Sequence, residues 1–413
     1  MKRKFHILTA LILLNGTCKI HAQYENEFTV TSEEGEKAVI TVPEAMTYTI
    51  DSLLSNYNAQ TYLEVDTTCN MRDFNPVFDR ETYIDRLKRL PTMMEMPYNE
   101  IVHQFIERYS GRLRRSVSFM LGACNFYMPI FEQALEAYGL PLELKYLPVI
   151  ESSLKPNAVS HAGAAGLWQF MITTGKQYGL EINSLVDERR DPIKASYAAA
   201  RYLKDLYRIF NDWNLVIAAY NCGPENVNKA IRRAGGPTDY WHIYPYLPKE
   251  TRGYVPAFIA ANYIMNYYCE HNICPMSTTL PTKSDTIMVS RDVHFEQIAY
   301  FCGLSIEQIK DLNPQYRRNI INGSTQLSVL RLPTEAINAF LDNEEDLYAY
   351  NADSLLSKRM EVTVNNTVPA YTPPRKSGRK SRYSSKSKYR KGKKAGRRSS
   401  RSSASSRKNR RRR

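Results

Sequence analysis

The chain has 413 residues and a mass of 47.6 kDa, which predicts two or three domains. The formal net charge is +14, but residues 375–413 hold 20 Lys and Arg and no Asp or Glu, while the preceding residues hold 36 basic against 42 acidic side chains. The folded body is therefore mildly acidic, and the high isoelectric point of the sequence comes from residues 375–413. Beyond the N-terminus, no stretch approaches the roughly 20 apolar residues of a membrane helix.

The N-terminus predicts export. A positively charged start, Met1–Lys4, precedes the apolar run Phe5–Leu14, and the small residue Ala22 follows shortly after. This order is typical of a secretory signal peptide, so residues 1–22 are interpreted as one. A transmembrane anchor is the alternative, although the apolar run is about half the length that a membrane helix requires.

Cys18 raises a further alternative, a lipoprotein, but Asn15–Thr17 is a poor acylation context. We therefore expect simple export to the periplasm or cell envelope, with outer-membrane association and lipidation left open. Six cysteines remain after residue 22, without the spacing of a metal site: Cys69, Cys124, Cys222, Cys269, Cys274 and Cys302. One disulfide can form in an oxidising compartment, with Cys269 and Cys274 as the candidate pair, and the pairing stays open.

Residues 23–95 form an N-terminal extension of mixed character, with strand-like fragments such as Lys37–Val42. Residues 96–275 turn helical, with apolar side chains every three or four residues in Phe126–Tyr138, Pro192–Phe210 and Thr251–Tyr268. Asp191 is a good N-cap, and Pro192 suits the first helical turn.

Residues 283–335 predict a small independent module of the order strand, helix, helix, strand. Its expected elements are Asp285–Val289, Phe295–Phe301, Ser305–Leu312 and Gln326–Leu332. Residues 366–413 are rich in Ser, Arg and Lys and hold almost no apolar residue, so this basic tail cannot bury enough surface to fold. The fold class is thus mainly α, with a small α+β module and a disordered tail.

Glu151 is the candidate catalytic residue. Leu144, Leu147 and Glu151 are spaced so that, on one helix, the carboxyl lies along an apolar stripe. Apolar surroundings destabilise the ionised carboxylate and raise its pKa, which suits a general acid near neutral pH. A Glu that reaches into solvent at a helix end is the simpler alternative, but the residues that follow favour the catalytic interpretation.

Small residues crowd the segment 158–166, where a backbone can approach a ligand closely. Trp168 and Phe170 follow, with Gln169 between them. Aromatic rings and an amide suit sugar rings, which present apolar faces and hydroxyl edges. The alternative is that either aromatic ring belongs to the core.

Several motifs follow one another over about 180 residues and resemble the catalytic domain of the soluble lytic transglycosylases, a lysozyme-like helical fold, and in particular its membrane-bound D type. The residues that carry the resemblance are Glu151–Ser153, Pro156, Ala158, Ser160, Gly163–Met171, Gly179–Leu180, Asp187–Pro192, Ala218–Gly223, Leu247–Thr251 and Tyr254–Pro256. Cys222 departs from the usual Ala of its motif. Both are small, so we expect little consequence.

The resemblance implies a role for each matching residue. Glu151 would be the acid and base, and Ser160, Gln169 and Met171 would line a glycan cleft. Tyr220 and Asn221 would contact substrate and support the site, and Tyr254 would hydrogen-bond Glu151. Glu250 is a weaker candidate for the cleft.

The reaction implied by the resemblance needs one carboxyl group. No Asp or Glu lies between Ser152 and Leu180, and the next ones are Glu181, Asp187, Glu188 and Asp191. The cluster Asp187–Pro192 indicates a salt-bridged turn and a helix cap. Most glycosidases need two carboxylates. In the family's mechanism, Glu151 protonates the oxygen that links N-acetylmuramic acid to N-acetylglucosamine, then takes the proton of the muramic 6-hydroxyl as this attacks its own anomeric carbon. The product is a 1,6-anhydro sugar.

Residues 285–333 resemble a LysM domain, a small carbohydrate-binding βααβ fold, on Ile287–Val289, Ile298–Ala299, Leu304–Ser305, Ile309, Leu312–Pro314 and Leu330–Pro333. The usual Gly-Asp-Thr turn is replaced by Arg291–His294, so glycan affinity stays open. The expected partners are peptidoglycan glycan strands and, for the basic tail, anionic envelope polymers or lipid head groups. A purely solvated tail is the alternative.

No cofactor, no metal and no nucleic acid is expected, because the seven His show no ligand spacing and export argues against a nucleic-acid partner. His161 is interpreted as a lone surface residue. The expected protein is a monomeric peptidoglycan lytic transglycosylase. A muramidase-type hydrolase, which a second carboxylate facing Glu151 would favour, and an inactive wall-binding protein are the alternatives.

Overall fold

The computed structural model describes residues 26–31, 37–47, 69, 74–236 and 239–357. The expected signal peptide (residues 1–22) and basic tail (366–413) lie outside the described residues. Among the helices of these segments, none combines the length and the apolar character that crossing a membrane requires.

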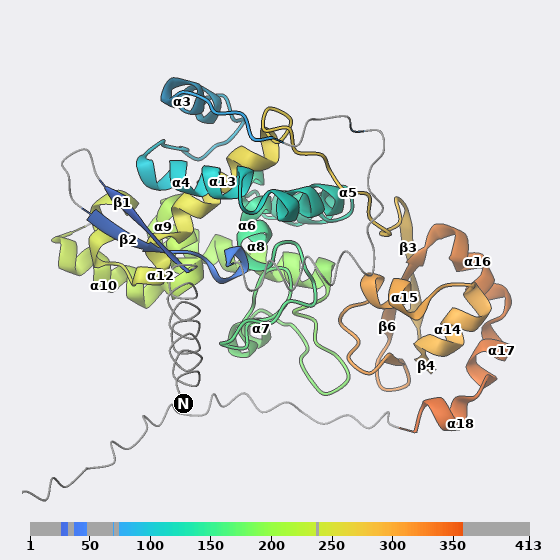
Figure 1. The fold of residues 1–413 in the computed structure, drawn as a ribbon. Helices are drawn as coiled ribbons and strands as arrows, with labels where there is room; N and C mark the ends of the chain where they lie inside the picture. The colour runs from blue at the N-terminus through green and yellow to red at the C-terminus, as the bar shows by residue number, and fades with distance from the viewer. Residues whose placement is uncertain (1–25, 32–36, 48–68, 70–73, 237–238, 358–413) are drawn as a thin grey trace, which may run out of the picture. The chain divides into compact units, whose positions relative to one another are not determined.

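The body of the protein is helical (Figure 1). Its longer helices are α4 (Glu100–Ser110), α5 (Arg114–Ala137), α8 (Pro192–Phe210), α9 (Trp213–Cys222), α10 (Pro224–Ala234) and α13 (Tyr254–Asn266). Its short elements are η2 (Leu142–Tyr146), α6 (Leu147–Ser152), α7 (Ile172–Gln177), α11 (Tyr240–Ile243), η3 (Tyr244–Tyr246) and α12 (Lys249–Arg252).

Helix α13 is the centre of this body. All but one of its residues are buried, including Tyr254 and Tyr263, and α13 packs against α4, α6 and α9. A helix that is apolar all round is expected at the core of a larger protein. The helix predicted over 192–210 is confirmed, and the Asp191 carboxylate accepts hydrogen bonds from the backbone N–H of Ile193 and Lys194, as the capping pattern predicts.

The N-terminal extension is part of the same core. Strands β1 (Glu27–Thr31) and β2 (Lys37–Thr41) pair as an antiparallel hairpin, followed by η1 (Glu44–Met46) and later by α3 (Arg80–Lys88). The hairpin lies beside α12 (Figure 1). A Cβ atom on Gly253 would lie 2.2 Å from the carbonyl oxygen of Thr41, so only glycine permits this approach.

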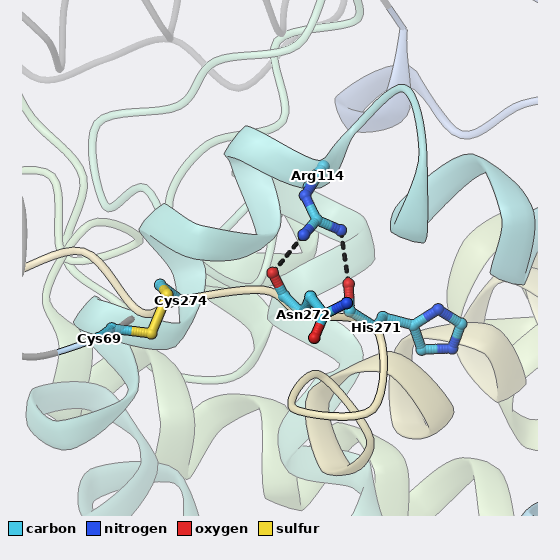
Figure 2. Close-up of a disulfide and its surroundings, with 5 residues drawn as sticks. All are labelled: Cys69, Arg114, His271, Asn272 and Cys274. Carbon is cyan, nitrogen blue, oxygen red and sulfur yellow. Dashed lines mark hydrogen bonds between the residues drawn. A yellow bond between two sulfur atoms is a disulfide. The ribbon is translucent and has the colours of Figure 1, made fainter. Parts of the chain in front are cut away.

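One disulfide joins distant segments. Cys69 is bonded to Cys274, with a Cα–Cα distance of 5.9 Å, and Cys269 is a free, exposed thiol. The candidate pair Cys269–Cys274 was therefore wrong, because the fold brings the extension, rather than the nearest cysteine in sequence, to Cys274. Figure 2 shows how Arg114 of α5 donates to the carbonyl oxygens of His271 and Asn272 just before this bond.

The C-terminal part has two small antiparallel pairs of strands. Strand β3 (Ser284–Val289) pairs with β6 (Ser328–Pro333), and β4 (Asp292–His294) pairs with β5 (Ile320–Asn322). Its helices are α14 (Phe295–Cys302), α15 (Ile306–Leu312), α16 (Thr334–Asp342), α17 (Glu344–Ala349) and α18 (Ala352–Leu355). The strand–helix–helix–strand order is confirmed, whereas the β4–β5 pair and the helices α16, α17 and α18 were not predicted.

The fold class expected from the sequence is confirmed for the described residues: a mainly helical body and a small α+β part. The expected independence of the α+β part is wrong in one respect. Its core, built around Phe295, Ile309 and Leu330, also contains Leu185 and Val186, which precede α8 in the helical body.

Candidate active site

Glu151 lies near the end of α6, a helix of only six residues. The sequence pattern predicted one helix that carries Leu144, Leu147 and Glu151, but the chain forms the 3₁₀ helix η2 up to Tyr146 and begins α6 at Leu147. Both leucines are nevertheless fully buried. The raised pKa of the carboxyl was predicted correctly, although the helix was not.

The carboxyl group of Glu151 has no cationic partner within the described residues, and burial raises its pKa to about 7. Two weaker effects oppose each other. The hydroxyl of Tyr254 donates a hydrogen bond to Oε1, which favours the ionised form, and the charge of Glu44 disfavours it. At neutral pH, Glu151 is therefore present in both its protonated and ionised forms.

The end of α6 holds Glu151 against the loop that follows. Ser153 and Leu154 adopt left-handed backbone angles, φ 50° and 59°, which end the helix. The Oγ atom of the buried Ser152 donates to the carbonyl oxygen of Leu167 at 2.9 Å. This bond ties α6 to the segment 158–170, which we call the glycine loop.

The glycine loop is held by its own backbone and side chains. Ser160 Oγ accepts from the N–H of Ala164 at 3.1 Å, and the amide of Gln169 donates to the carbonyl of Gly166 at 2.8 Å and of Ala158 at 3.3 Å. Gln169 has φ 48°, a backbone strain of the kind found at functional sites. A Cβ on Gly166 would lie 1.7 Å from the carbonyl oxygen of Arg189, so glycine is required there.

The expected aromatic wall is wrong. Trp168 is 0% exposed and Phe170 2% exposed, and Trp168 Nε1 donates to Ser196 Oγ of α8 at 2.9 Å. Both rings therefore belong to the core, which was the alternative weighed from the sequence. They anchor the loop and leave the half-buried Gln169 between them.

The remaining predicted residues differ in their position. The Tyr220 hydroxyl donates to the carbonyl of Trp168 at 2.7 Å, and Asn221 Oδ1 accepts from Thr251 Oγ1 at 2.9 Å, so both support neighbouring segments. Met171 is half-buried at the start of α7. Glu250 is exposed on α12, and no hydrogen bond joins it to the other predicted residues within the described segments.

Sequence reasoning missed Glu44. It lies on η1, which packs against α6, and its Oε1 accepts from the backbone N–H of His161 at 3.2 Å. The Glu44 side chain is 40% exposed, and the exposed His161 ring lies 3.8 Å from the same oxygen. No pattern could have found Glu44, because it is 107 positions from Glu151 in a segment without motifs.

The acidic cluster after the loop is structural, as predicted. Asp187 pairs with Arg189, Glu188 pairs with Lys194, and Asp191 caps α8. The described segments hold no group of three His, Cys, Asp or Glu side chains that could bind a metal ion. An open depression of about 580 Å³ lies by β3 and α16 and contains none of the predicted site residues.

Two segments of the chain match domains of known proteins. Residues 128–243 match the transglycosylase SLT domain, and residues 283–349 match the LysM-like domain of lytic transglycosylase MltD. The chain thus contains a transglycosylase SLT domain, which carries Glu151 and the glycine loop, followed by a LysM-like domain of the MltD type.

Among curated proteins, the chain is 32% identical over 202 residues to membrane-bound lytic murein transglycosylase D of Escherichia coli K12, which is 48% of this chain and 44% of the relative. The chain thus matches less than half the length of this relative. Among solved structures, an inactive mutant of lytic transglycosylase Slt from Pseudomonas aeruginosa is 22% identical, with a TM-score of 0.30 over 35% of this chain and 25% of that chain. The 70 kDa soluble lytic transglycosylase from Escherichia coli is 26% identical, with a TM-score of 0.31 over 37% of this chain and 26% of that chain.

Proposed function

We propose that the protein is a peptidoglycan lytic transglycosylase in which Glu151 is the acid and base. The observation that carries this proposal is a carboxyl group that has no cationic partner among the described residues, has a pKa of about 7 and accepts a hydrogen bond through Oε1 from the hydroxyl of Tyr254. Because Oε1 accepts this bond, Oε2 is the oxygen that carries the proton. A general acid with a pKa near the working pH combines a protonated population with a useful driving force for proton transfer.

In the proposed reaction, Glu151 donates its proton to the glycosidic oxygen between N-acetylmuramic acid and N-acetylglucosamine as the bond from this oxygen to the anomeric carbon breaks. The Glu151 carboxylate then takes the proton of the muramic 6-hydroxyl, whose oxygen bonds to the same anomeric carbon. The products are a 1,6-anhydromuramic end and a free 4-hydroxyl. The proton returns to Glu151, and no water is consumed.

We assign the surrounding residues to two roles. Ser160, Gln169 and Met171 would line the glycan site, since they lie in or directly after the glycine loop and are half-buried. Tyr220 and Asn221 would hold the surrounding segments in place. Glu250 would contact a more distant part of the glycan, because it is exposed.

Glu44 supports a second candidate, hydrolysis by the same fold. Its charge acts on Glu151, and it comes from a different segment of the chain. An inverting hydrolase uses such a second carboxylate to activate water. Against this role, one oxygen of Glu44 already accepts the N–H of His161.

Mass spectrometry of peptidoglycan digested by the purified protein distinguishes the two candidates. We expect 1,6-anhydromuramic ends from both the native protein and the Glu44→Gln variant, and no cleavage by Glu151→Gln. Reducing muramic ends from the native protein that disappear in Glu44→Gln would establish the hydrolase instead.

The proposed location is the cell envelope, after export, and the proposed state is a monomer. The LysM-like domain would bind glycan strands. The basic tail would bind anionic polymers or lipid head groups of the envelope, a hypothesis that rests on the sequence alone because residues 366–413 lie outside the described residues.

A further inference from the structure

The SLT and LysM-like domains share a hydrogen-bonded seam. The buried residues Leu185 and Val186 of the first domain lie in the core of the second. The backbone N–H of Asp187 donates to the carbonyl of Gln315 at 2.8 Å, and the N–H of Arg317 donates to the carbonyl of Leu185 at 2.8 Å. The segment before α8 is thus paired, residue by residue, with a loop of the LysM-like domain.

Asp187 is the ionic centre of this seam and is 0% exposed. Its two oxygens accept from Nε and Nη2 of Arg189 at 2.8 and 2.9 Å, and Oδ2 also accepts from Nη2 of Arg317 at 3.2 Å. Arg317 Nη1 donates to the carbonyl of Asn183 at 3.2 Å. A buried carboxylate needs such partners, and a two-point contact with Arg also fixes orientation.

Arg189 connects Asp187 to the glycine loop of the candidate active site. Its Nη1 donates to the carbonyl of Gly163 at 2.9 Å and to that of Phe170 at 3.0 Å, so one guanidinium joins two points of the glycine loop. The backbone carbonyl of Arg189 also packs on Gly166. Ser160 and Gln169, the proposed glycan contacts, lie in this loop.

We propose that Arg317, a residue of the LysM-like domain, is a positioning residue of the active site. It acts through Asp187 and Arg189, whose guanidinium holds the glycine loop in place beside Glu151. The LysM-like domain then contributes to bond cleavage itself and not only to retention on the wall. This inference rests on the proposed function.

Arg317→Ala tests the proposal in the full-length protein, with soluble glycan fragments as substrate. Misplacing a binding loop by about 1 Å can cost up to roughly 10²-fold in rate. We expect kcat to fall by about 10-fold to 10²-fold, with the alkaline limb of the pH profile unchanged, because Arg317 does not contact Glu151. Arg317→Lys should recover part of the loss, since one ammonium can reach Asp187 without reproducing the planar fork.

The matched control is Arg291→Ala. Arg291 lies in the same domain and pairs with the exposed Glu345, away from Asp187. Its removal breaks an ion pair of the LysM-like domain that does not involve Asp187, and should leave kcat unchanged. Equal losses in the two variants, or a native kcat in Arg317→Ala, would overturn the proposal.

Hydrogen–deuterium exchange of peptides that cover residues 158–170 provides a readout independent of activity. We expect faster exchange in Arg317→Ala than in Arg291→Ala, because the amides of Ala165 and Phe170 are bonded within the loop that Arg189 holds. Unchanged exchange would refute the coupling. A native protein that cleaves no glycan would refute the proposed function, while the exchange result would still decide the coupling.

Discussion

Two carboxyl groups of this protein, the half-buried Glu151 and the buried Asp187, have opposite surroundings. Glu151 has no cation among its partners in the described segments and receives one hydrogen bond from Tyr254. Asp187 is surrounded by guanidinium groups, with Arg189 in a two-point contact and Arg317 at 3.2 Å. The first carboxyl can gain and lose a proton near neutral pH, whereas the second is held in place by ion pairs.

The difference shows how one functional group serves chemistry or structure. Burial without a counter-charge makes ionisation costly and brings the pKa of Glu151 to about 7. Burial among three guanidinium groups, those of Arg189, Arg190 and Arg317, makes the Asp187 anion a required part of the packing, because loss of one partner leaves the others uncompensated. Replacing each carboxylate by its amide therefore probes the two environments with the same chemical change.

The largest expected effect is on catalysis. Glu151→Gln keeps the size of the side chain but can neither donate nor take up the proton, so turnover of peptidoglycan should fall by at least roughly 10²–10⁴. Binding to sacculi should survive. A steady-state assay together with a sedimentation assay measures both. Turnover near the native value would mean that another residue is the acid.

The matched stability experiment compares Asp187→Asn with Glu151→Gln. Asp187→Asn leaves buried guanidinium groups without their anion and should destabilise the fold by about 3–5 kcal/mol. Glu151→Gln should instead stabilise the fold above pH 7. The folded-state pKa of Glu151 is raised, so the native protein loses stability as pH rises from about 4.5 through about 7, and the amide does not ionise.

Thermal unfolding across a pH series measures both changes. The stabilisation by Glu151→Gln should vanish below about pH 4.5, where the native carboxyl is protonated in both folded and unfolded states. If the two amide variants changed the melting temperature in the same direction at pH 8, the contrast between the two environments would be wrong.

A smaller effect is expected on the pH profile. Activity should fall as pH rises through about 7, because the first step needs protonated Glu151. Tyr254→Phe removes a hydrogen bond that favours the ionised form of Glu151, so the alkaline limb of the profile should move to higher pH. Glu44→Gln removes a negative charge that disfavours the ionised form, so the alkaline limb should move to lower pH. Rate profiles of the three proteins check the directions. Shifts of the same sign would contradict the assignment of causes.

The smallest effect is expected from removal of the basic tail. Truncation after Pro374 should leave cleavage of soluble glycan fragments unchanged. Retention on sacculi should fall at low salt, and the difference should shrink as salt rises, since exposed charges are screened. A pull-down over a salt series compares the two proteins. Equal retention at every salt concentration would make the tail a passive extension.

Local patterns determined much of this protein by themselves. The cap at Asp191, the helix 192–210 and the strand–helix–helix–strand order depend on residues close in sequence, so periodicity and capping chemistry predict them. The raised pKa of Glu151 was also predicted from the apolar pattern, although the chain changes from η2 to α6 between Leu144 and Leu147. Motif order placed Glu151 and Tyr254 together across 103 positions.

Only the tertiary structure decided the contacts that join distant segments without a motif. The Cys69–Cys274 bond, the approach of Glu44 to Glu151 and the pairing of Arg317 with Asp187 span 205, 107 and 130 positions. The burial of Trp168 in the core was likewise decided by the tertiary structure. The residue type alone does not say whether an aromatic side chain of a loop is exposed, because this depends on the helices that pack around it. Such contacts depend on how whole elements pack, and a linear pattern of residues does not encode that packing locally.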